Sequence, residues 1–426
     1  MKTILFIIAS LFLYQSGNSK DVINLYQPEN TLQSIENDLV FWSEKNLSNE
    51  QSTYQLRLAQ TWMRHFKVTS DINALNKAVE ITEIVYHQSP LNRGPVCRSL
   101  ARMYISQHRF CNALDMALES SEIGDNERAS SLLLYDVYAE LGMDQAAQEM
   151  MALVSNHKDF NYLIRAAKWE DAQGNLSQAI NFLEKARDLA ESGKEDSQLN
   201  WIYSNLGDFY GHAGNIPESK KSFMKALEVN PADWYSMKGL AWIYYSGEGD
   251  TDHAHSILNR IKEYNQSPDI RLLESQIHIY EGKTYYGNNL KEVVIKNLDN
   301  DDYGIMYRTV IAEHLASNGV HKKAIELAKA EVYSRNIPET NALLAFCKYK
   351  AGFKEEAFSI AKTQVLHKTY EPVALYHIME SVRPLKSTYR EICKEVLSAD
   401  YELGPVKIKK IKSIAQRNDS DLVNAY

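Results

Sequence analysis

Cysteine is scarce in this chain, and the motifs that mark common classes of enzyme are missing. Four of the 426 residues are cysteines, and no two of them form a C-x-x-C pair. Such a set does not make a disulfide framework, so we expect buried free thiols. The chain also lacks H-E-x-x-H, a phosphate-binding loop, a dinucleotide fingerprint and G-x-S-x-G, and it gives no motif-based indication of an enzyme. The cysteines are Cys97, Cys111, Cys347 and Cys393.

Positive charge and flexible linkers are also in short supply. The formal net charge is −8, whereas nucleic-acid-binding proteins carry clustered Lys and Arg, so no nucleic-acid partner is predicted. No stretch rich in Pro, Gly and Ser divides the chain, which favours one continuous array over separate domains. The densest basic segment lies near the end, and we interpret it as the solvated face of a capping helix; the alternative is contact with an anionic lipid or polymer. It contains Lys407, Lys409, Lys410, Lys412 and Arg417.

The first nineteen residues have the composition of a secretory signal peptide. Lys2 is their single charged residue, an apolar run extends from Ile4 to Tyr14, and small residues precede the expected cleavage point near Ser19. The run is too short to cross a bilayer comfortably, so no transmembrane segment is predicted. We therefore expect an exported protein, periplasmic or extracellular after cleavage.

Small residues return at a fixed interval along the rest of the chain. Ala113, Ala146 and Ala179 lie 33 residues apart, and a second series has the same spacing. A period of this length is typical of stacked helical hairpins, each of which buries its apolar face against its neighbours. Between Ala179 and Ser219 the interval grows to 40, which we assign to a longer connection around 191–197.

The clearest repeat covers residues 200–231. Its first helix is expected to carry an aromatic residue, a Leu-Gly pair and a tyrosine on one face, and its second helix carries small and aromatic residues before a terminating proline. Gly207 and Ser219 are expected to leave room where the two helices cross. In these residues the chain resembles the tetratricopeptide repeat family. The residues that carry the resemblance are Tyr203, Leu206, Gly207, Tyr210, Ser219, Phe223, Ala226 and Pro231.

The resemblance implies an all-α fold, a right-handed α-solenoid of about ten stacked helix-turn-helix hairpins. It covers most of the chain after the signal peptide. The predicted segments are a signal peptide at 1–19, an N-terminal helical segment with a degenerate repeat at 20–93, repeats at 94–267, a degenerate repeat or bend at 268–304, repeats at 305–403, and a C-terminal capping helix with a tail at 404–426.

In such arrays the first helix of each hairpin lines the concave side, so a partner is expected to contact first-helix residues outside the packing set. Aromatic rings interleaved with Arg and Lys suit a peptide, because rings accept apolar side chains and cations bind carboxylates and carbonyls. The alternative is that these rings pack against the neighbouring hairpin. The predicted contact residues are Arg98, Arg102, Tyr135, Tyr138, Lys168, Trp201, Asp208, His212, Tyr235, Lys238, Trp242 and Tyr245.

A short segment at 249–255 contains two aspartates and two histidines, residue types that bind metal ions. On a helix, His253 and His255 point about 200° apart and cannot easily share one ion. Asp250 or Thr251 is better explained as a helix N-cap. We therefore predict no metal site and no cofactor.

Two functions from different classes remain open from the sequence. The first is a non-enzymatic exported scaffold that binds a peptide or protein partner, for example within a cell-envelope assembly. The second is a glycan-binding or polysaccharide-export component of the envelope, in which Trp201, Tyr235 and Trp242 would stack on sugar rings. An enzyme hidden in residues 268–304 is a weaker third option.

Overall fold

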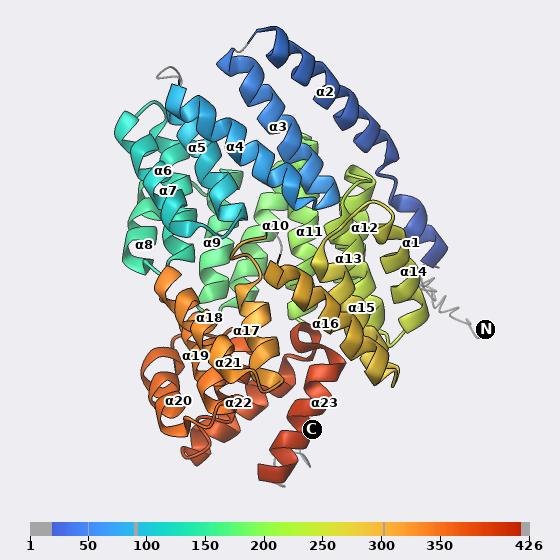
Figure 1. Cartoon of the computed structure of the whole chain (residues 1–426), viewed down its shortest axis with the longest axis vertical. Coiled ribbons are helices and arrows are strands. Elements are labelled where there is room, and N and C mark those ends of the chain that lie inside the picture. Colours follow the sequence, from blue (N-terminus) through green and yellow to red (C-terminus); the bar gives the residue numbers. More distant parts are fainter. Residues whose placement is uncertain (1–18, 50, 89–92, 301–302, 419–426) are drawn as a thin grey trace, which may run out of the picture.

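A computed structural model describes residues 19–49, 51–88, 93–300 and 303–418. Within these ranges every regular element is a helix, and the helices pair as antiparallel hairpins that stack along the chain (Figure 1). The predicted all-α solenoid is therefore confirmed. Among the described helices, none has the length and apolarity to cross a bilayer.

Ten hairpins can be followed in the described part of the chain, which matches the predicted number. The first five are α3 (Ser52–Thr69) with α4 (Ile72–Gln88), α5 (Arg93–Ser106) with α6 (Phe110–Ile123), α7 (Glu127–Glu140) with α8 (Asp144–Leu153), α9 (Phe160–Ala172) with α10 (Leu176–Gly193), and α11 (Asp196–His212) with α12 (Ile216–Val229).

The other five hairpins include the stretch at 268–304, which forms a helical hairpin. They are α13 (Trp234–Trp242) with α14 (Thr251–Lys262), α15 (Pro268–Tyr280) with α16 (Thr284–Asn300), α17 (Arg308–Ser317) with α18 (His321–Ser334), α19 (Pro338–Lys350) with α20 (Lys354–Ile360), and α21 (Pro372–Met379) with α22 (Lys386–Ser398). One π-helical turn extends α13 (η1, Ile243–Gly247) and another extends α20 (η2, Ala361–Val365).

The crossing of α11 and α12 shows why the repeat needs its small residues. A Cβ added to Gly207 would come within 2.6 Å of the ring of Phe223, which is fully buried. The hydroxyl of Ser219 donates a 2.5 Å hydrogen bond to the carbonyl oxygen of Gly207. Only small side chains allow backbones to approach this closely, so the predicted role of these two positions is confirmed.

The predicted long connection around 191–197 is wrong. Helix α10 continues to Gly193, and only Lys194 and Glu195 separate it from α11. Lys194 ends α10 in the left-handed conformation, with φ of 54°, a common way to stop a helix. The extra residues therefore lengthen the two helices instead of forming a loop.

The array curves until hairpins that are distant in sequence touch. The side-chain amide of Asn265 donates a 2.7 Å hydrogen bond to the carbonyl of Val68, and the backbone N–H of Gln266 donates one of 2.7 Å to Thr69. The indole of Trp234 also donates to the carbonyl of Lys67 at 3.0 Å. These bonds join the end of α3 to the α13–α15 region.

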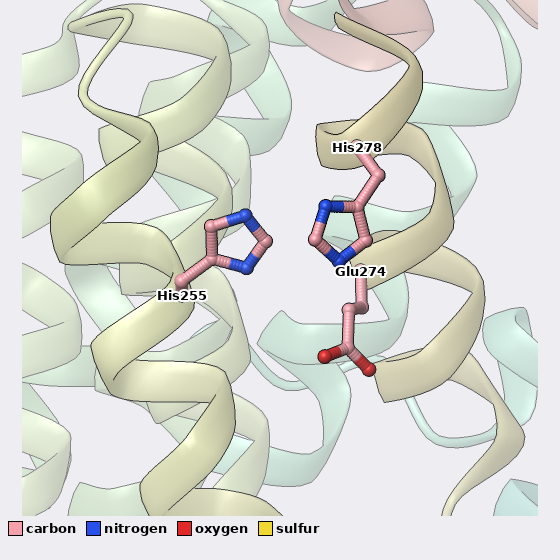
Figure 2. A group of neighbouring side chains, drawn as sticks. All are labelled: His255, Glu274 and His278. Atoms are coloured by element: carbon pink, nitrogen blue, oxygen red, sulfur yellow. The ribbon is translucent and has the colours of Figure 1, made fainter. Parts of the chain in front are cut away.

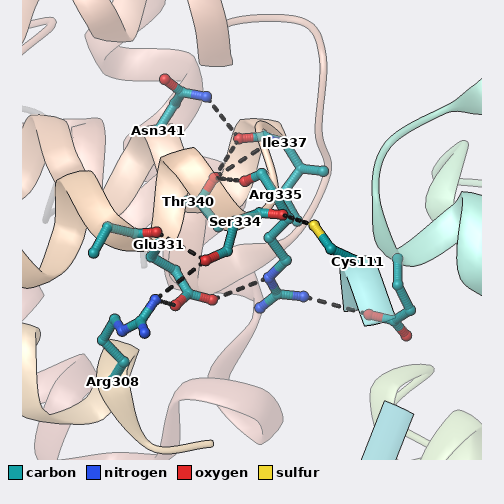
Figure 3. A network of polar contacts seen from close by, with 10 residues as sticks. Cys111, Arg308, Glu331, Ser334, Arg335, Ile337, Thr340 and Asn341 are labelled. Carbon is teal, nitrogen blue, oxygen red and sulfur yellow. Dashed lines mark hydrogen bonds and ion pairs between the residues drawn. The ribbon is translucent and has the colours of Figure 1, made fainter. Parts of the chain in front are cut away.

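A second set of contacts joins the first hairpins to the later ones at Arg335 (Figure 3). The Arg335 guanidinium lies 5.2 Å from the centre of the Phe110 ring and 3.3 Å from the carboxylate of Glu140. It also pairs with Glu331, which Arg308 contacts from the other side. Two separate ties therefore make the solenoid more compact than the open platform that the repeats alone suggest.

Three helices lie outside the ten hairpins: α1 (Ser19–Leu25), α2 (Glu29–Ser48) and α23 (Asp400–Asn418). Val22 and Tyr26 are fully buried, and α1 packs against α12 and α14. The predicted signal peptide, apart from Ser19, lies outside the described residues, as does the tail at 419–426. All four cysteines are free thiols; three are buried as expected, but Cys111 is exposed.

The helix predicted from 404 onward is solvated on one side only. Gly404 is non-helical, with φ of 70° and ψ of 160°, and it separates the first turn of α23, which begins at Asp400, from the helix that follows. Lys409, Lys410 and Arg417 are exposed as expected, whereas the other side of α23 packs against α11, η1, α15 and α21 as well as its neighbour α22. Ile411 and Ala415 are fully buried. Lys407 lies 3.5 Å from the carboxylate of Glu313 and over the ring of Tyr376. An amphipathic helix with an apolar face is stabilised by packing it away from water, and here the concave side of the solenoid provides the surface.

Candidate functional site

The predicted contact residues divide into two groups on the concave side. We call the first the upstream groove, lined by Arg102, Tyr135, Lys168 and Trp201 from α5, α7, α9 and α11. We call the second the downstream groove, where Trp242 and Tyr245 meet α23. The upstream groove is open, whereas the downstream groove is covered by the chain's own C-terminal helix.

The upstream groove encloses a cavity of about 350 Å³. Arg102 and Lys168 expose their side chains there, and Trp201 closes one end beside Phe160, with ring centres 6.0 Å apart. Tyr135 is buried, and its hydroxyl donates a 3.0 Å hydrogen bond to the carbonyl of Arg165. The structure therefore brings four of the predicted residues together around one concavity, with Tyr135 as its floor.

Two residues of this groove were missed by the sequence reasoning. Arg165 pairs with Asp136 at 2.5 Å, and its guanidinium also donates to the carbonyl of Leu132. Trp169 lines the same cavity. Arg165 precedes Lys168 by three residues and Trp169 by four, so helical spacing placed them on neighbouring faces of α9, and this signal could have been used.

Arg98 and Tyr138 have structural surroundings that differ from those of the groove residues. Arg98 is buried, and its guanidinium forms a bidentate ion pair with Asp125, with N–O distances of 2.6 and 2.8 Å. Tyr138 is half-buried and packs against the apolar core formed by the first hairpins. Neither residue lines the upstream cavity, so the face on which a side chain lies decides its surroundings more than its helix does.

The downstream groove is filled by contacts with α23. The indole of Trp242 donates a 2.8 Å hydrogen bond to the carbonyl of Tyr401, and the Tyr401 ring lies edge-on to His212 with centres 5.9 Å apart. Tyr245 is fully buried between Trp242 and Tyr280, at 5.6 and 5.5 Å. These residues serve packing within the chain in this structure.

Asp208, Tyr235 and Lys238 lie between the two grooves. The Tyr235 hydroxyl donates a 2.7 Å hydrogen bond to Asp208, and burial raises the pKa of Asp208 to about 6. The ammonium of Lys238 lies 5.2 Å from the Tyr235 ring and 3.7 Å from the carboxylate of Asp269. The Tyr235 side chain remains exposed, whereas Lys238 is half-buried and paired, so this group presents mainly the tyrosine ring to solvent.

A larger cavity of about 640 Å³ lies between α15, α16, α17, α21 and α23. Glu313 stands at its wall, 3.5 Å from both Lys407 and His377. Although burial opposes it, the charge of Lys407 and a hydrogen bond from His377 hold the pKa of Glu313 well below its usual range. Glu292 lines the same cavity and accepts a 2.7 Å hydrogen bond from His314.

The N-cap predicted in the segment at 249–255 is present. Asp250 caps α14 by accepting a hydrogen bond from the backbone N–H of His253. The two histidines diverge: His253 stacks on Tyr244, with centres 5.2 Å apart, and His255 faces His278, with centres 4.6 Å apart. His278 comes from the next hairpin, and no spacing within 249–255 could indicate it.

No protein-family model and no curated protein sequence matches this chain. Among solved structures, a tetratricopeptide repeat protein from Parabacteroides merdae is 15% identical, over 55% of this chain and 92% of its own, with a TM-score of 0.38. Pseudomonas aeruginosa pilF is 16% identical, over 50% and 92%, with a TM-score of 0.36. A human IFIT1 dimer structure with PPP-AAAA is 14% identical, over 81% and 86%, with a TM-score of 0.47.

The repeat type is visible in this chain's own helices. Each hairpin packs against the next, and the close crossing of α11 and α12 uses the glycine and serine that the repeat pattern places there. The concave side carries the open upstream groove and the occupied downstream groove. The chain is an all-α solenoid of tetratricopeptide-like helical hairpins.

Proposed function

We propose that this chain is a non-enzymatic scaffold that binds a peptide segment of a protein partner in the upstream groove. The observation that carries the proposal is the gathering of Arg102, Lys168 and Trp201 around a cavity floored by Tyr135. These residues come from four successive first helices, so a segment lying across them would contact four repeats. Repeated contacts along an elongated surface are how solenoid proteins bind extended ligands.

The chemistry of the groove favours a peptide with both apolar and acidic groups. The cavity is lined by the cations of Arg102, Arg165 and Lys168 and by the carboxylates of Asp136, Glu140 and Asp144. Asp136 is paired with Arg165 and Glu140 with Arg335, whereas Arg102 and Lys168 are exposed residues. Rings such as Trp201 and Trp169 accept apolar side chains with little loss of conformational freedom. A segment that places a carboxylate near the cations and an apolar side chain near the indoles fits both features.

The downstream groove supports the same function from within the chain. Helix α23 occupies it by a combination of an indole hydrogen bond, aromatic contacts and ion pairs. A concave surface that accepts a helix of its own chain has the shape and chemistry needed to accept a segment of another chain. The upstream groove offers the same types of side chain without an occupant from the described residues.

We further propose that the scaffold is exported and acts in the cell envelope or outside the cell. The charged and apolar pattern of residues 1–19 supports export. The burial of Val22 and Tyr26 is consistent with a mature chain that begins near Ser19, because the fold needs the residues that follow. Expression of the full chain in a bacterial host, followed by cell fractionation and intact-mass measurement, tests both the location and the cleavage point.

The binding function is tested by selecting peptides from a displayed library on the chain from residue 19 onward. We expect the selected peptides to lose at least about tenfold in affinity, roughly 1.4 kcal/mol, in Lys168→Ala and in Trp201→Ala. Arg187→Ala is the matched control, because Arg187 lies on a second helix, α10, and pairs with its neighbour Asp188. Peptides that bind all three variants equally would place the contact outside the upstream groove.

An oligosaccharide array used in parallel distinguishes the glycan-binding alternative. A sugar that binds the wild-type chain, fails to bind Trp201→Ala and binds Lys168→Ala normally would favour that alternative. A peptide whose binding requires both residues favours the scaffold. A peptide carboxylate forms a strong charge-assisted hydrogen bond with the ammonium of Lys168, whereas a neutral sugar does not.

A further inference from the structure

Three side chains able to bind a metal ion converge between two hairpins. His255 projects from α14, and Glu274 and His278 project from α15 (Figure 2). The ligand atoms that they offer all lie within 4.8 Å of one another. Glu274 and His278 are four residues apart, so they share one face of α15. The side chains are 13–20% exposed, which leaves an approach for a small ion.

A fourth residue, Glu281, fixes the orientation of both imidazoles. Its Oε1 lies 3.1 Å from Nε2 of His255, and its Oε2 lies 3.2 Å from Nδ1 of His278. A carboxylate accepts hydrogen bonds and does not donate them, so these two ring nitrogens carry the protons. Nδ1 of His255 and Nε2 of His278 then keep their lone pairs. A carboxylate behind each histidine is the usual support of metal-binding imidazoles.

The charges around the cluster include two lysines. Lys262 donates to Oε1 of Glu274 at 2.5 Å, which leaves the second oxygen of that carboxylate for another partner. Lys283 lies 2.9 Å from Glu281. The positive charges of the two lysines equal the negative charges of the two glutamates. A bound dication would therefore give the site a net positive charge and would compete with Lys262 for the Glu274 carboxylate.

We propose that His255, Glu274 and His278 bind one divalent transition-metal ion, zinc, with Glu281 as the residue that positions both imidazoles. Two histidines and one carboxylate are an established ligand set for zinc, with a fourth position left for water or another ligand. Imidazole nitrogens favour zinc, copper and nickel over magnesium and calcium. The ion would link hairpin α13–α14 to hairpin α15–α16, so the expected role is to stabilise the junction between repeats.

The test uses the chain from residue 19 onward, stripped with a chelator and titrated with Zn²⁺ in a calorimeter. We expect one ion per chain and a rise in the thermal unfolding midpoint on addition of Zn²⁺. His278→Ala and Glu274→Gln should lose both effects. His253→Ala is the matched control, because His253 lies on the same helix and pairs with Asp250 outside the cluster. Circular dichroism of each variant without metal shows whether it has folded.

Co²⁺ provides a second readout that does not depend on stability. Binding of Co²⁺ to two imidazoles and a carboxylate should give visible absorption bands in the wild-type chain and in His253→Ala. The bands should be absent from His278→Ala. A wild-type chain that takes up no Zn²⁺ and shows no such bands, or a His278→Ala variant that binds as tightly as the wild type, would overturn the proposal.

Two further variants separate the positioning and charge effects from a purely structural role. Glu281→Gln should weaken Zn²⁺ binding by about 10- to 100-fold, the usual effect of removing a residue that supports a ligand. Lys262→Met should tighten it, because Glu274 would lose a competing cation. A structural role alone would make both variants behave alike, and an unchanged affinity in both would count against the assigned geometry.

Discussion

The indole nitrogen of Trp242 donates a 2.8 Å hydrogen bond to the backbone carbonyl of Tyr401, a residue 159 positions later in the chain. The same indole lies against Gly404, where an added Cβ would come within 2.8 Å of the ring. Gly404 has φ of 70°, a conformation that glycine adopts without strain. On the other side, the ring of Tyr401 occupies the space above Gly211. Two glycines and one indole thus fit α23 closely into the downstream groove.

Removal of the indole N–H should make local opening of α23 more frequent while α23 stays bound in the downstream groove. Trp242→Phe keeps an aromatic ring but leaves the carbonyl of Tyr401 without this donor, at a cost of about 1 kcal/mol. If α23 opens locally, backbone amides in 400–418 should exchange about fivefold faster. Hydrogen–deuterium exchange followed by mass spectrometry measures this rate for the segment.

Trp201→Phe is the control for this experiment, because Trp201 lies in the upstream groove beside Phe160. It should leave the exchange of 400–418 unchanged. Equal acceleration in the two variants, or none in Trp242→Phe, would mean that the bond to Tyr401 does not hold the helix in place.

A methyl group at Gly207 should destabilise the central hairpins. The Phe223 ring cannot move away, because Gly239 lies against it as closely from the next helix. Overpacking of this kind costs about 1–3 kcal/mol, so Gly207→Ala should lower the urea midpoint of unfolding. Gly193→Ala is the opposite case: its Cβ would meet no atom within 4 Å. Because Gly193 is the last residue of α10, this change should raise the free energy of unfolding by less than the roughly 0.5–1 kcal/mol typical of a helix interior.

The sequence was sufficient for the features that repeat. The spacing of small residues predicted the hairpins, and the Leu-Gly pair with Ser219 predicted the close crossing of α11 and α12. These contacts join neighbours in the chain, so each leaves a periodic trace. Arg102, Tyr135, Lys168 and Trp201 were found in the same way, because successive first helices present successive groove residues.

Contacts that occur once leave no such trace. Arg335 meets Phe110 across helices whose separation in sequence follows no period. His255 meets His278 between the consecutive helices α14 and α15, but neither histidine recurs at the repeat spacing. The position of α23 depends on the total curvature of the ten hairpins. This curvature is the sum of the small rotations between successive repeats, and the sequence of a single repeat does not indicate its rotation. The solvated face predicted for α23 therefore holds for Lys409, Lys410 and Arg417, which are exposed, but not for Lys407, which lies against Glu313.

Arg335 is predicted to hold the first and later hairpins together. Arg335→Gln removes the contact with the Phe110 ring and the ion pairs with Glu140 and Glu331. Glu331 is buried but keeps Arg308 as a partner, so the loss should be about 2 kcal/mol, within the usual range for hydrogen bonds to charged groups. The urea midpoint should fall, and exchange should rise in both α6 and α18. Arg187→Gln, which breaks an exposed pair with Asp188, should change the midpoint little.

The stability of the concave side should depend on pH between about 4 and 6. Burial raises the pKa of Asp208 to about 6 from an ordinary value of 3.8, and burial also raises that of Glu402, on α23, to about 6 from 4.5. A carboxyl group with a higher pKa in the folded chain binds its proton more tightly there, so acid favours folding. The contribution of these two groups is complete below about pH 4 and is lost as pH rises through 6.

Other carboxylates act in the opposite direction but in a different range. Hydrogen bonds from Arg260 lower the pKa of Glu29 to about 2, so its contribution is lost only as the pH falls below about 4.5. The double variant Asp208→Asn with Glu402→Gln should therefore remove the decline in stability between pH 4.5 and 6 while keeping the loss at lower pH. Urea unfolding at a series of pH values measures both limbs. Asp188→Asn, at a side chain 66% exposed, should leave the decline in place; if it removes the decline as well, the buried carboxyls of the concave side are not its source.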